Sequence, residues 1–74
     1  MRISDTQKDI LRNTTAAQKI TPAVLADKIG SRPGPIARSG HSLVKQGLLT
    51  TGETKEGETF FKRTAAGGKI AKKL

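Results

Sequence analysis

The most informative part of the chain is residues 21–49, which read TPAVLADKIGSRPGPIARSGHSLVKQGLL. Thr21 followed by Pro22 is a strong helix start, because a threonine hydroxyl caps free N–H groups and proline suits the first helical position. Gly30 is a natural residue to end this helix in the left-handed conformation. The pattern therefore predicts a short helix over residues 22–29. Its apolar face consists of Leu25, Ala26 and Ile29.

A turn with two prolines follows, and residues 35–46 then predict a second helix, with Gly34 as its cap. At about 100° per residue, one face of this helix carries apolar residues and glycine, and the opposite face is polar. The apolar face consists of Ile36, Gly40, Leu43 and Val44, and the polar face of Arg38, His41 and Lys45. Gly40 costs the helix about 1 kcal/mol relative to alanine. It indicates either the close approach of another helix or a tolerated weakness.

The flanking segments predict two more helices and a β-hairpin. Ser4 to Gln7 has the form of a capping box, so a helix is expected over residues 5–15. Ile20 is isolated and suits a short strand or turn. Residues 48–51 and 58–63 predict two strands joined by a polar turn between Gly52 and Gly57. A last helix is expected over residues 65–73, capped by Thr64.

The predicted order is therefore helix, short strand, helix, helix, strand, strand, helix. This order is mainly α with a small β-hairpin (α+β), in a single domain over residues 1–74. Two helices joined around Gly30 have helix-turn-helix spacing, and the hairpin after them corresponds to a wing. Phe60 and Phe61 must point to opposite faces of their strand, so one of them is expected in the core.

Charge and composition narrow the range of functions that this chain can have. Fourteen Lys and Arg against six acids leave a net charge of +8 on 74 residues, which attracts polyanions. The chain has no cysteine and one histidine, and it has no phosphate-binding glycine motif, apolar span or signal core. We therefore expect a cytoplasmic, nucleoid-associated protein that is not an enzyme, has no cofactor or metal site, and does not bind membranes.

The joint spacing of Leu25-Ala26, Gly30, Ile36, Leu43 and Gly47-Leu48 resembles that of winged helix-turn-helix transcription regulators. Thr64 and Gly67 resemble the Thr-x-x-Gly that follows the wing in bacterial and archaeal regulators of the MarR and PadR type. The resemblance covers residues 6–72. It implies sequence-specific binding of double-stranded DNA and transcription regulation, with the helix over residues 35–46 in the major groove.

Three features depart from this pattern. The recognition helix opens with Pro-Gly-Pro rather than with serine or threonine, so fewer side chains there can touch bases. Arg63 occupies the place of a usually buried leucine. The wing carries Glu53, Glu56 and Glu58 against Lys55 alone, a net charge of −2. Because phosphates repel acids, this wing either stays off the DNA or faces a protein partner.

The candidate DNA-binding residues form three groups. The recognition helix and the turn before it contribute Arg32, Arg38, His41, Ser42 and Lys45. The candidates for contacts to the DNA backbone are Lys19, Thr21, Lys28, Lys62 and Arg63. The wing contributes Thr54 and Lys55. Arg38 is best placed to read a guanine edge, and Arg32 suits a phosphate.

Other interpretations remain open from the sequence. The polar helix face could be merely solvated, and Thr21 could serve only as a cap. The chain could be a non-catalytic protein-interaction module, for example one by which a phage or plasmid protein engages host transcription machinery. Nonspecific binding of DNA or binding of structured RNA also fits the charge. The last helix is short, so we expect a monomer or a weak homodimer.

Overall fold

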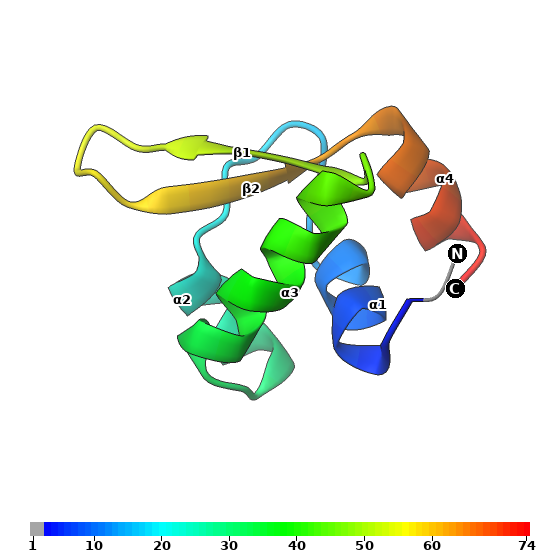
Figure 1. Ribbon diagram of the computed structural model, residues 1–74, viewed down its shortest axis with the longest axis horizontal. Helices are drawn as coiled ribbons and strands as arrows, with labels where there is room; N and C mark the ends of the chain where they lie inside the picture. The colour runs from blue at the N-terminus through cyan, green and yellow to red at the C-terminus, as the bar shows by residue number, and fades with distance from the viewer. Residues whose placement is uncertain (1–2) are drawn as a thin grey trace.

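The computed structural model describes residues 3–74 and shows helices packed beside a projecting two-stranded hairpin (Figure 1). The elements are α1 (Asp5–Arg12), α2 (Pro22–Ile29), α3 (Pro33–Lys45), β1 (Leu49–Glu53), β2 (Thr59–Arg63) and α4 (Ala65–Lys72). In Figure 1, the hairpin projects above α2, while α4 lies at the other end of the molecule beside α1. The predicted order and the mainly α fold class are confirmed.

The helix starts follow the predicted cap chemistry. The N–H of Gln7 donates to Ser4 Oγ (3.2 Å), and the N–H of Ser4 donates to Gln7 Oε1 (2.9 Å). Thr21 Oγ1 accepts from the N–H of Val24, and Thr64 Oγ1 accepts from the N–H of Gly67. These bonds satisfy N–H groups that have no partner within the helix.

The end predicted for the first helix is wrong, because α1 ends at Arg12 and not at residue 15. Asn13 stops the helix: its backbone N–H donates to the carbonyls of Asp9 and Ile10, and its side-chain amide donates to the Asp9 carbonyl (2.8 Å). Thr14 is buried, and its hydroxyl donates to the Leu11 carbonyl. Short polar side chains thus compete with the next helical turn for its hydrogen bonds.

The start predicted for the third helix is also wrong. α3 begins at Pro33, and Arg32, not Gly34, is its N-cap residue. Arg32 is extended (φ −102°, ψ 149°), as the residue before a proline prefers. Pro33 and Pro35 occupy the first and third helical positions, where an N–H would have no partner within the helix. α3 ends at Lys45, one residue before the predicted end.

The strands begin and end at different residues than expected. β1 covers Leu49–Glu53 instead of residues 48–51, and β2 covers Thr59–Arg63 instead of residues 58–63. Gly52, expected in the turn, pairs with Phe60 across the hairpin. A Cβ at Gly52 would lie 2.7 Å from Phe60 Cζ, so the phenyl ring occupies the space that a side chain at this position would need. Similarly, α4 ends at Lys72, and Lys73, expected in the helix, is its C-cap.

Ile20 and Phe61 join the loop before α2 to the hairpin. The N–H of Phe61 donates to the Ile20 carbonyl (2.7 Å), and the N–H of Ile20 donates to the Phe61 carbonyl (3.1 Å). The pair is an isolated antiparallel bridge, which confirms the short strand expected at Ile20.

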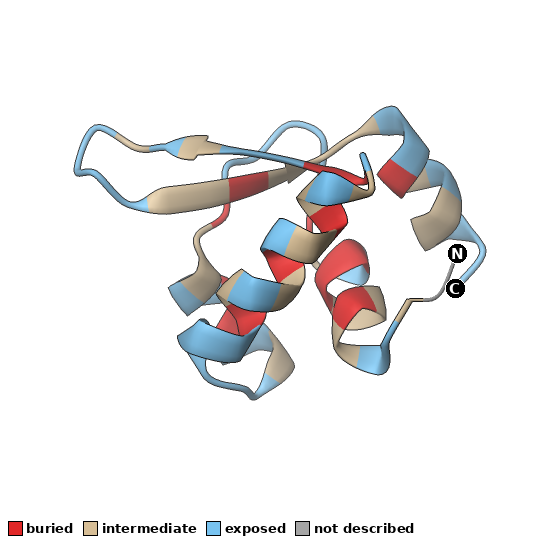
Figure 2. Cartoon of the chain, viewed as in Figure 1, coloured by how far each residue is buried: buried red, intermediate tan, exposed pale blue. Residues whose placement is uncertain are grey.

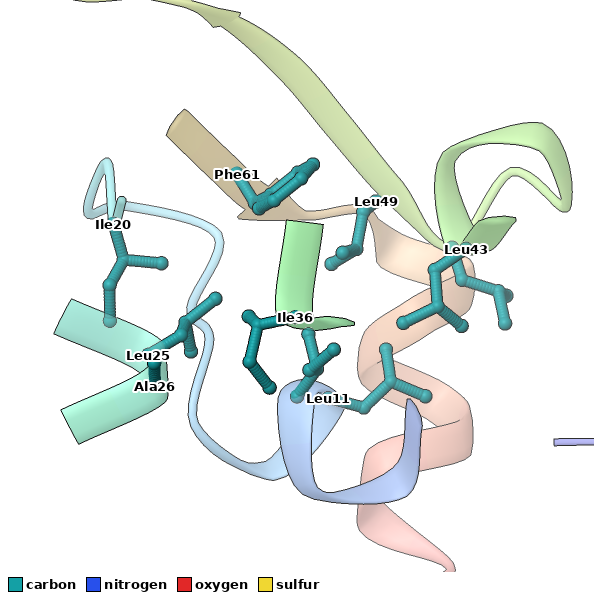
Figure 3. Packing of buried hydrophobic residues seen from close by; sticks show 10 residues of the cluster. Leu11, Ile20, Leu25, Ala26, Ile36, Leu43, Leu49 and Phe61 are labelled. Carbon is teal, nitrogen blue, oxygen red and sulfur yellow. The ribbon is translucent and has the colours of Figure 1, made fainter. Parts of the chain in front are cut away.

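Phe61 is the largest residue of the core, and its side chain is fully buried. In Figure 3, Phe61 and Leu49 lie above Ile36 of α3, Leu25 lies to its left and Leu11 lies below it. The core consists of Ile10, Leu11, Ile20, Leu25, Ala26, Ile36, Leu43, Leu48, Leu49 and Phe61. Phe60 is only half-buried, as expected for one of two adjacent phenylalanines on a strand.

Gly40 of α3 lies against a strand. The alternative that this glycine allows the close approach of another helix is therefore wrong. A Cβ at Gly40 would lie 2.6 Å from both Cε2 and Cζ of Phe61. The missing side chain therefore lets the aromatic ring of β2 reach the surface of α3.

Candidate nucleic-acid interface

The outer face of α3 brings together three of the predicted residues. Arg38, His41 and Lys45 are exposed, whereas Ile36 and Leu43 are buried on the face that meets the core. Figure 2 shows this division, with exposed residues on the outer side of α3 and buried ones toward the core. The ion pairs within residues 3–74 are Lys8–Asp5 and Arg12–Asp9, both on α1, so the three side chains of α3 carry no ionic partner there.

His41 is exposed but rests on the core. Its ring meets that of Phe61 edge to face, with 5.3 Å between the centroids and 75° between the planes. Such a contact is typical of favourable aromatic pairs. The imidazole is therefore held between the outer face of α3 and the base of the hairpin.

Ser42 turns away from these residues. It is half-buried, and its Oγ accepts a hydrogen bond from Gln7 Nε2 of α1 at 3.1 Å. The structure therefore separates Ser42 from the outer face of α3 and places it in the contact with α1.

Arg32 and Thr21 lie at the N-termini of the two helices of the helix-turn-helix. Arg32 is exposed, and its side chain makes no capping bond. Thr21 Oγ1 accepts from the N–H of Val24, which leaves the hydroxyl hydrogen free to donate elsewhere. Lys28 is exposed in the last turn of α2.

Lys19 and Lys62 belong to a different surface. Phe61 faces the core, so Phe60 and Lys62, its neighbours along β2, point to the outer face of the hairpin. Lys19 Nζ lies 5.1 Å from the centroid of the Phe60 ring, a cation–π contact. These two lysines are thus separated from the Arg38 side of α3 by the thickness of the hairpin.

Arg63 is held by the fold. Its Nη1 donates to the carbonyl of Leu11, near the C-terminus of α1, at 3.1 Å. A Cβ at Gly67 would lie 3.0 Å from Arg63 Cγ and would collide with the Leu48 carbonyl. Arg63 stands where the family pattern has a buried leucine. It is covered by α4, which starts with small residues. The adjacent glycines 67 and 68 were the only sign of this packing in the sequence.

The turn of the hairpin exposes more acidic than basic side chains. Thr54 Oγ1 accepts from the N–H of Glu58, so this hydroxyl helps to form the turn. Lys55 is exposed, and so are the three glutamates Glu53, Glu56 and Glu58. Both wing candidates thus lie among acidic side chains.

Residues 3–74 enclose no pocket and contain no group of three or more His, Asp or Glu side chains that could hold a metal ion. Among the same residues, no helix combines the length and apolar character needed to cross a bilayer.

Solved structures of transcription regulators share this fold. A mutant of ZitR from Lactococcus lactis superposes with a TM-score of 0.83 and 23% identity, over 99% of this chain and 51% of ZitR. The adhesin competence repressor AdcR from Streptococcus pyogenes gives 0.83 and 26%, over 97% of this chain and 55% of AdcR. The transcriptional regulator BldR from Sulfolobus solfataricus gives 0.84 and 17%, over 99% and 53%.

These similarities confirm the winged-helix fold that the resemblance implied. The chain spans about half the length of the regulators it matches. Neither a protein-family model nor a curated protein sequence matches it.

Proposed function

We propose that this domain binds double-stranded DNA in a sequence-dependent manner and regulates transcription, with α3 in the major groove. The observation that carries the proposal is the outer face of α3, where Arg38, His41 and Lys45 are exposed and have no ionic partner within residues 3–74. An α-helix with its side chains is about 10–12 Å wide and fits a major groove of about 12 Å. The net charge of +8 supports binding to a polyanion.

In this proposal some residues of the helix-turn-helix contact bases and others contact phosphates. Arg38 projects from the first half of α3, where its guanidinium can donate two parallel hydrogen bonds to guanine O6 and N7. His41 lies one turn further along the same face and contacts the neighbouring base pair or phosphate. Arg32, Lys28 and Lys45 contact phosphates, which position the domain without reading sequence. The free hydroxyl hydrogen of Thr21 suits a further phosphate.

The test is binding of a random-sequence duplex pool by fluorescence anisotropy at two salt concentrations, followed by sequencing of the bound fraction. We expect an enriched motif and an affinity that falls steeply as salt rises. Salt-sensitive binding without enrichment would contradict sequence recognition. It would instead favour nonspecific coating of DNA, or structured RNA if RNA binds better than a matched duplex.

The role of Arg38 is tested on the enriched duplex and on scrambled duplexes. Arg38→Ala should lower the affinity for the enriched duplex by ~1–3 kcal/mol and relax its sequence preference, whereas Lys28→Ala should weaken all duplexes alike. The charge-matched control is Lys73→Ala at the end of α4, which should change neither. Equal losses on every duplex for Arg38→Ala would contradict base reading.

A second candidate function rests on the hairpin turn, where Glu53, Glu56 and Glu58 are exposed beside Lys55 alone. Such a tip suits a non-catalytic module that binds a basic protein surface, in line with the alternative drawn from the sequence. A stable complex with a partner protein that survives Arg38→Glu but is lost in the triple Glu→Gln variant of the tip would establish this function. Absence of duplex binding at low salt would make it the leading interpretation.

We also propose that the domain is a monomer or weak homodimer that resides with the nucleoid in the cytoplasm. Sedimentation equilibrium tests the first point, and a tight dimer at low concentration would contradict it. Co-localisation with DNA in cells tests the second.

A further inference from the structure

His41 is the one side chain of this protein that ordinarily changes its charge near neutral pH. The sequence contains a single histidine and no cysteine or tyrosine, so every other charged side chain is Lys, Arg, Asp or Glu. Histidine changes its charge between about pH 5 and pH 8, a range in which those four residue types ordinarily keep theirs. Protonation of His41 therefore adds one positive charge to the net charge of +8.

The added charge lies on the face of α3 that is proposed to meet DNA. His41 is exposed, and it follows Arg38 by three residues and precedes Lys45 by four. Residues with this spacing share one side of a helix. The imidazole thus lies between two side chains whose positive charge is permanent in this pH range.

The fold holds the imidazole in this place. The edge-to-face contact with Phe61, with 5.3 Å between the ring centroids, joins the exposed ring of His41 to a fully buried side chain. Gly40 leaves the space that the Phe61 ring needs beside α3. The charge that His41 gains on protonation is therefore placed by the core at a fixed point of the surface.

The hairpin brings one carboxylate to the side of the sheet that faces His41. Thr51 pairs with Phe61, and the pair of Glu53 and Thr59 lies on the same side, nearer the turn. Glu53 is exposed and forms no ion pair with His41. The carboxylate is thus left in water and does not hold the proton of the imidazole.

The other two elements packed against α3 are α1 and α2, which contact its buried residues. The charged side chains of these two helices are Asp5, Lys8, Asp9, Arg12, Asp27 and Lys28. None of their carboxylates forms an ion pair with His41, because the ion pairs within residues 3–74 both lie on α1. Protonated His41 therefore has no anionic partner in the described part of the chain.

From this geometry we infer that His41 makes the binding of double-stranded DNA pH-dependent, with the protonated imidazole as the form that binds tightly. This inference rests on the proposed function. A protonated imidazole donates from both ring nitrogens, whereas a neutral one donates from only one. Nearby phosphates favour the charged form, so the complex binds the proton more tightly than the free protein does. By linkage, the affinity for DNA is high when His41 is protonated and falls as pH rises.

The experiment measures the affinity of the full chain for the enriched duplex by fluorescence anisotropy at about pH 5.5 and about pH 8. We expect an affinity about three- to tenfold higher at the lower pH, since a proton held tenfold more tightly in the complex gives a tenfold gain at most. A plot of log affinity against log salt should also be steeper by about 0.9 at the lower pH, because one more cation meets the phosphates.

Two substitutions of His41 and one control assign the effect to this residue. His41→Gln should bind equally at both pH values. His41→Arg should also be insensitive to pH, with the steeper salt dependence at both values. Lys45→Gln, the control on the same face, should bind more weakly but keep the ratio between the two pH values. Thermal unfolding at both pH values verifies that each variant is folded where its affinity is measured.

Equal affinity of the natural chain at both pH values would overturn the inference, and so would a pH dependence that persists in His41→Gln. Arg38→Ala, measured on the same duplex, separates this failure from failure of the proposed function. If Arg38→Ala weakens binding and pH has no effect, only the inference about His41 is wrong. If the natural chain binds no duplex at either pH, the proposed function is wrong and the inference fails with it.

Discussion

Gly40 and Phe61 form a contact that leaves no room for a single added carbon. A Cβ at Gly40 would lie 2.6 Å from two atoms of the fully buried Phe61 ring, which the surrounding core prevents from moving. We expect Gly40→Ala to lower the free energy of unfolding by ~1–3 kcal/mol, although alanine is the better helix former. Urea denaturation of the variant measures this change.

Gly68→Ala is the control for that prediction, because its Cβ would make an ordinary contact at 3.6 Å. Combining Gly40→Ala with Phe61→Leu should cost less than the sum of the two single changes, because the smaller side chain leaves space for the methyl group. Additive losses would show that the ring does not obstruct residue 40.

Arg63 offers a second prediction at the scale of one residue. Arg63→Ala should destabilise the domain by ~1–2 kcal/mol, because it removes a charged hydrogen bond to the Leu11 carbonyl and the packing of the arginine stem. Lys62→Ala, one position away, should stay within ~0.5 kcal/mol. Thermal unfolding of both variants checks this order. A larger effect of Arg63→Ala on duplex affinity than on stability would support the phosphate role expected from the sequence.

At the scale of elements, Thr64 ties α4 to the end of α3. Its hydroxyl accepts from the N–H of Gly67 (3.1 Å) and donates to the carbonyl of Gly47 (2.7 Å). Thr64→Ala should cost ~1–2 kcal/mol, and Thr64→Ser should retain most of the stability. Thr21→Ala should cost less, because its capping bond to Val24 is 3.4 Å long. Equal losses at Thr21 and Thr64, measured by urea denaturation, would contradict the bridging role of Thr64.

The starts of α1, α2 and α4 were predictable because cap chemistry is local. Ser4, Thr21 and Thr64 cap their helices as expected, since a hydroxyl reaches N–H groups only two or three residues away. The end of β1 was less predictable because strand pairing depends on a residue of the other strand. Gly52 pairs with Phe60 of the other strand, whose ring fills the space beside the glycine. Nothing within residues 48–52 indicates that partner.

The same distinction between local and distant determinants holds for the candidate interface. Helical periodicity correctly placed Arg38, His41 and Lys45 on one exposed face, because the pattern of a single helix determines it. Lys62 was predicted from charge alone as a contact to the DNA backbone, and strand alternation directs it to the outer face of the hairpin. Which charges share a surface depends on how elements pack, and charge counts carry no such information.

At the scale of the whole molecule, this separation of charges predicts the salt dependence of binding. If Arg32, Lys28 and Lys45 alone contact phosphates, a plot of log affinity against log salt should have a slope of about −2.7. If Lys19 and Lys62 contact them as well, the slope should be about −4.5. Anisotropy titrations between low and moderate salt distinguish the two values. Lys73→Ala should leave the slope unchanged in either case.

The loop before α2 also changes how the hairpin meets other chains. A sheet edge with unpaired backbone groups is a template for strand addition and aggregation. Phe61 and Arg63 of β2 direct their N–H groups outward from the hairpin, and the carbonyls of Ile20 and Thr15 accept them. The base of β2 is therefore already occupied along its outer edge. A second chain could extend this small sheet only by pairing with β1 or by displacing the loop before α2.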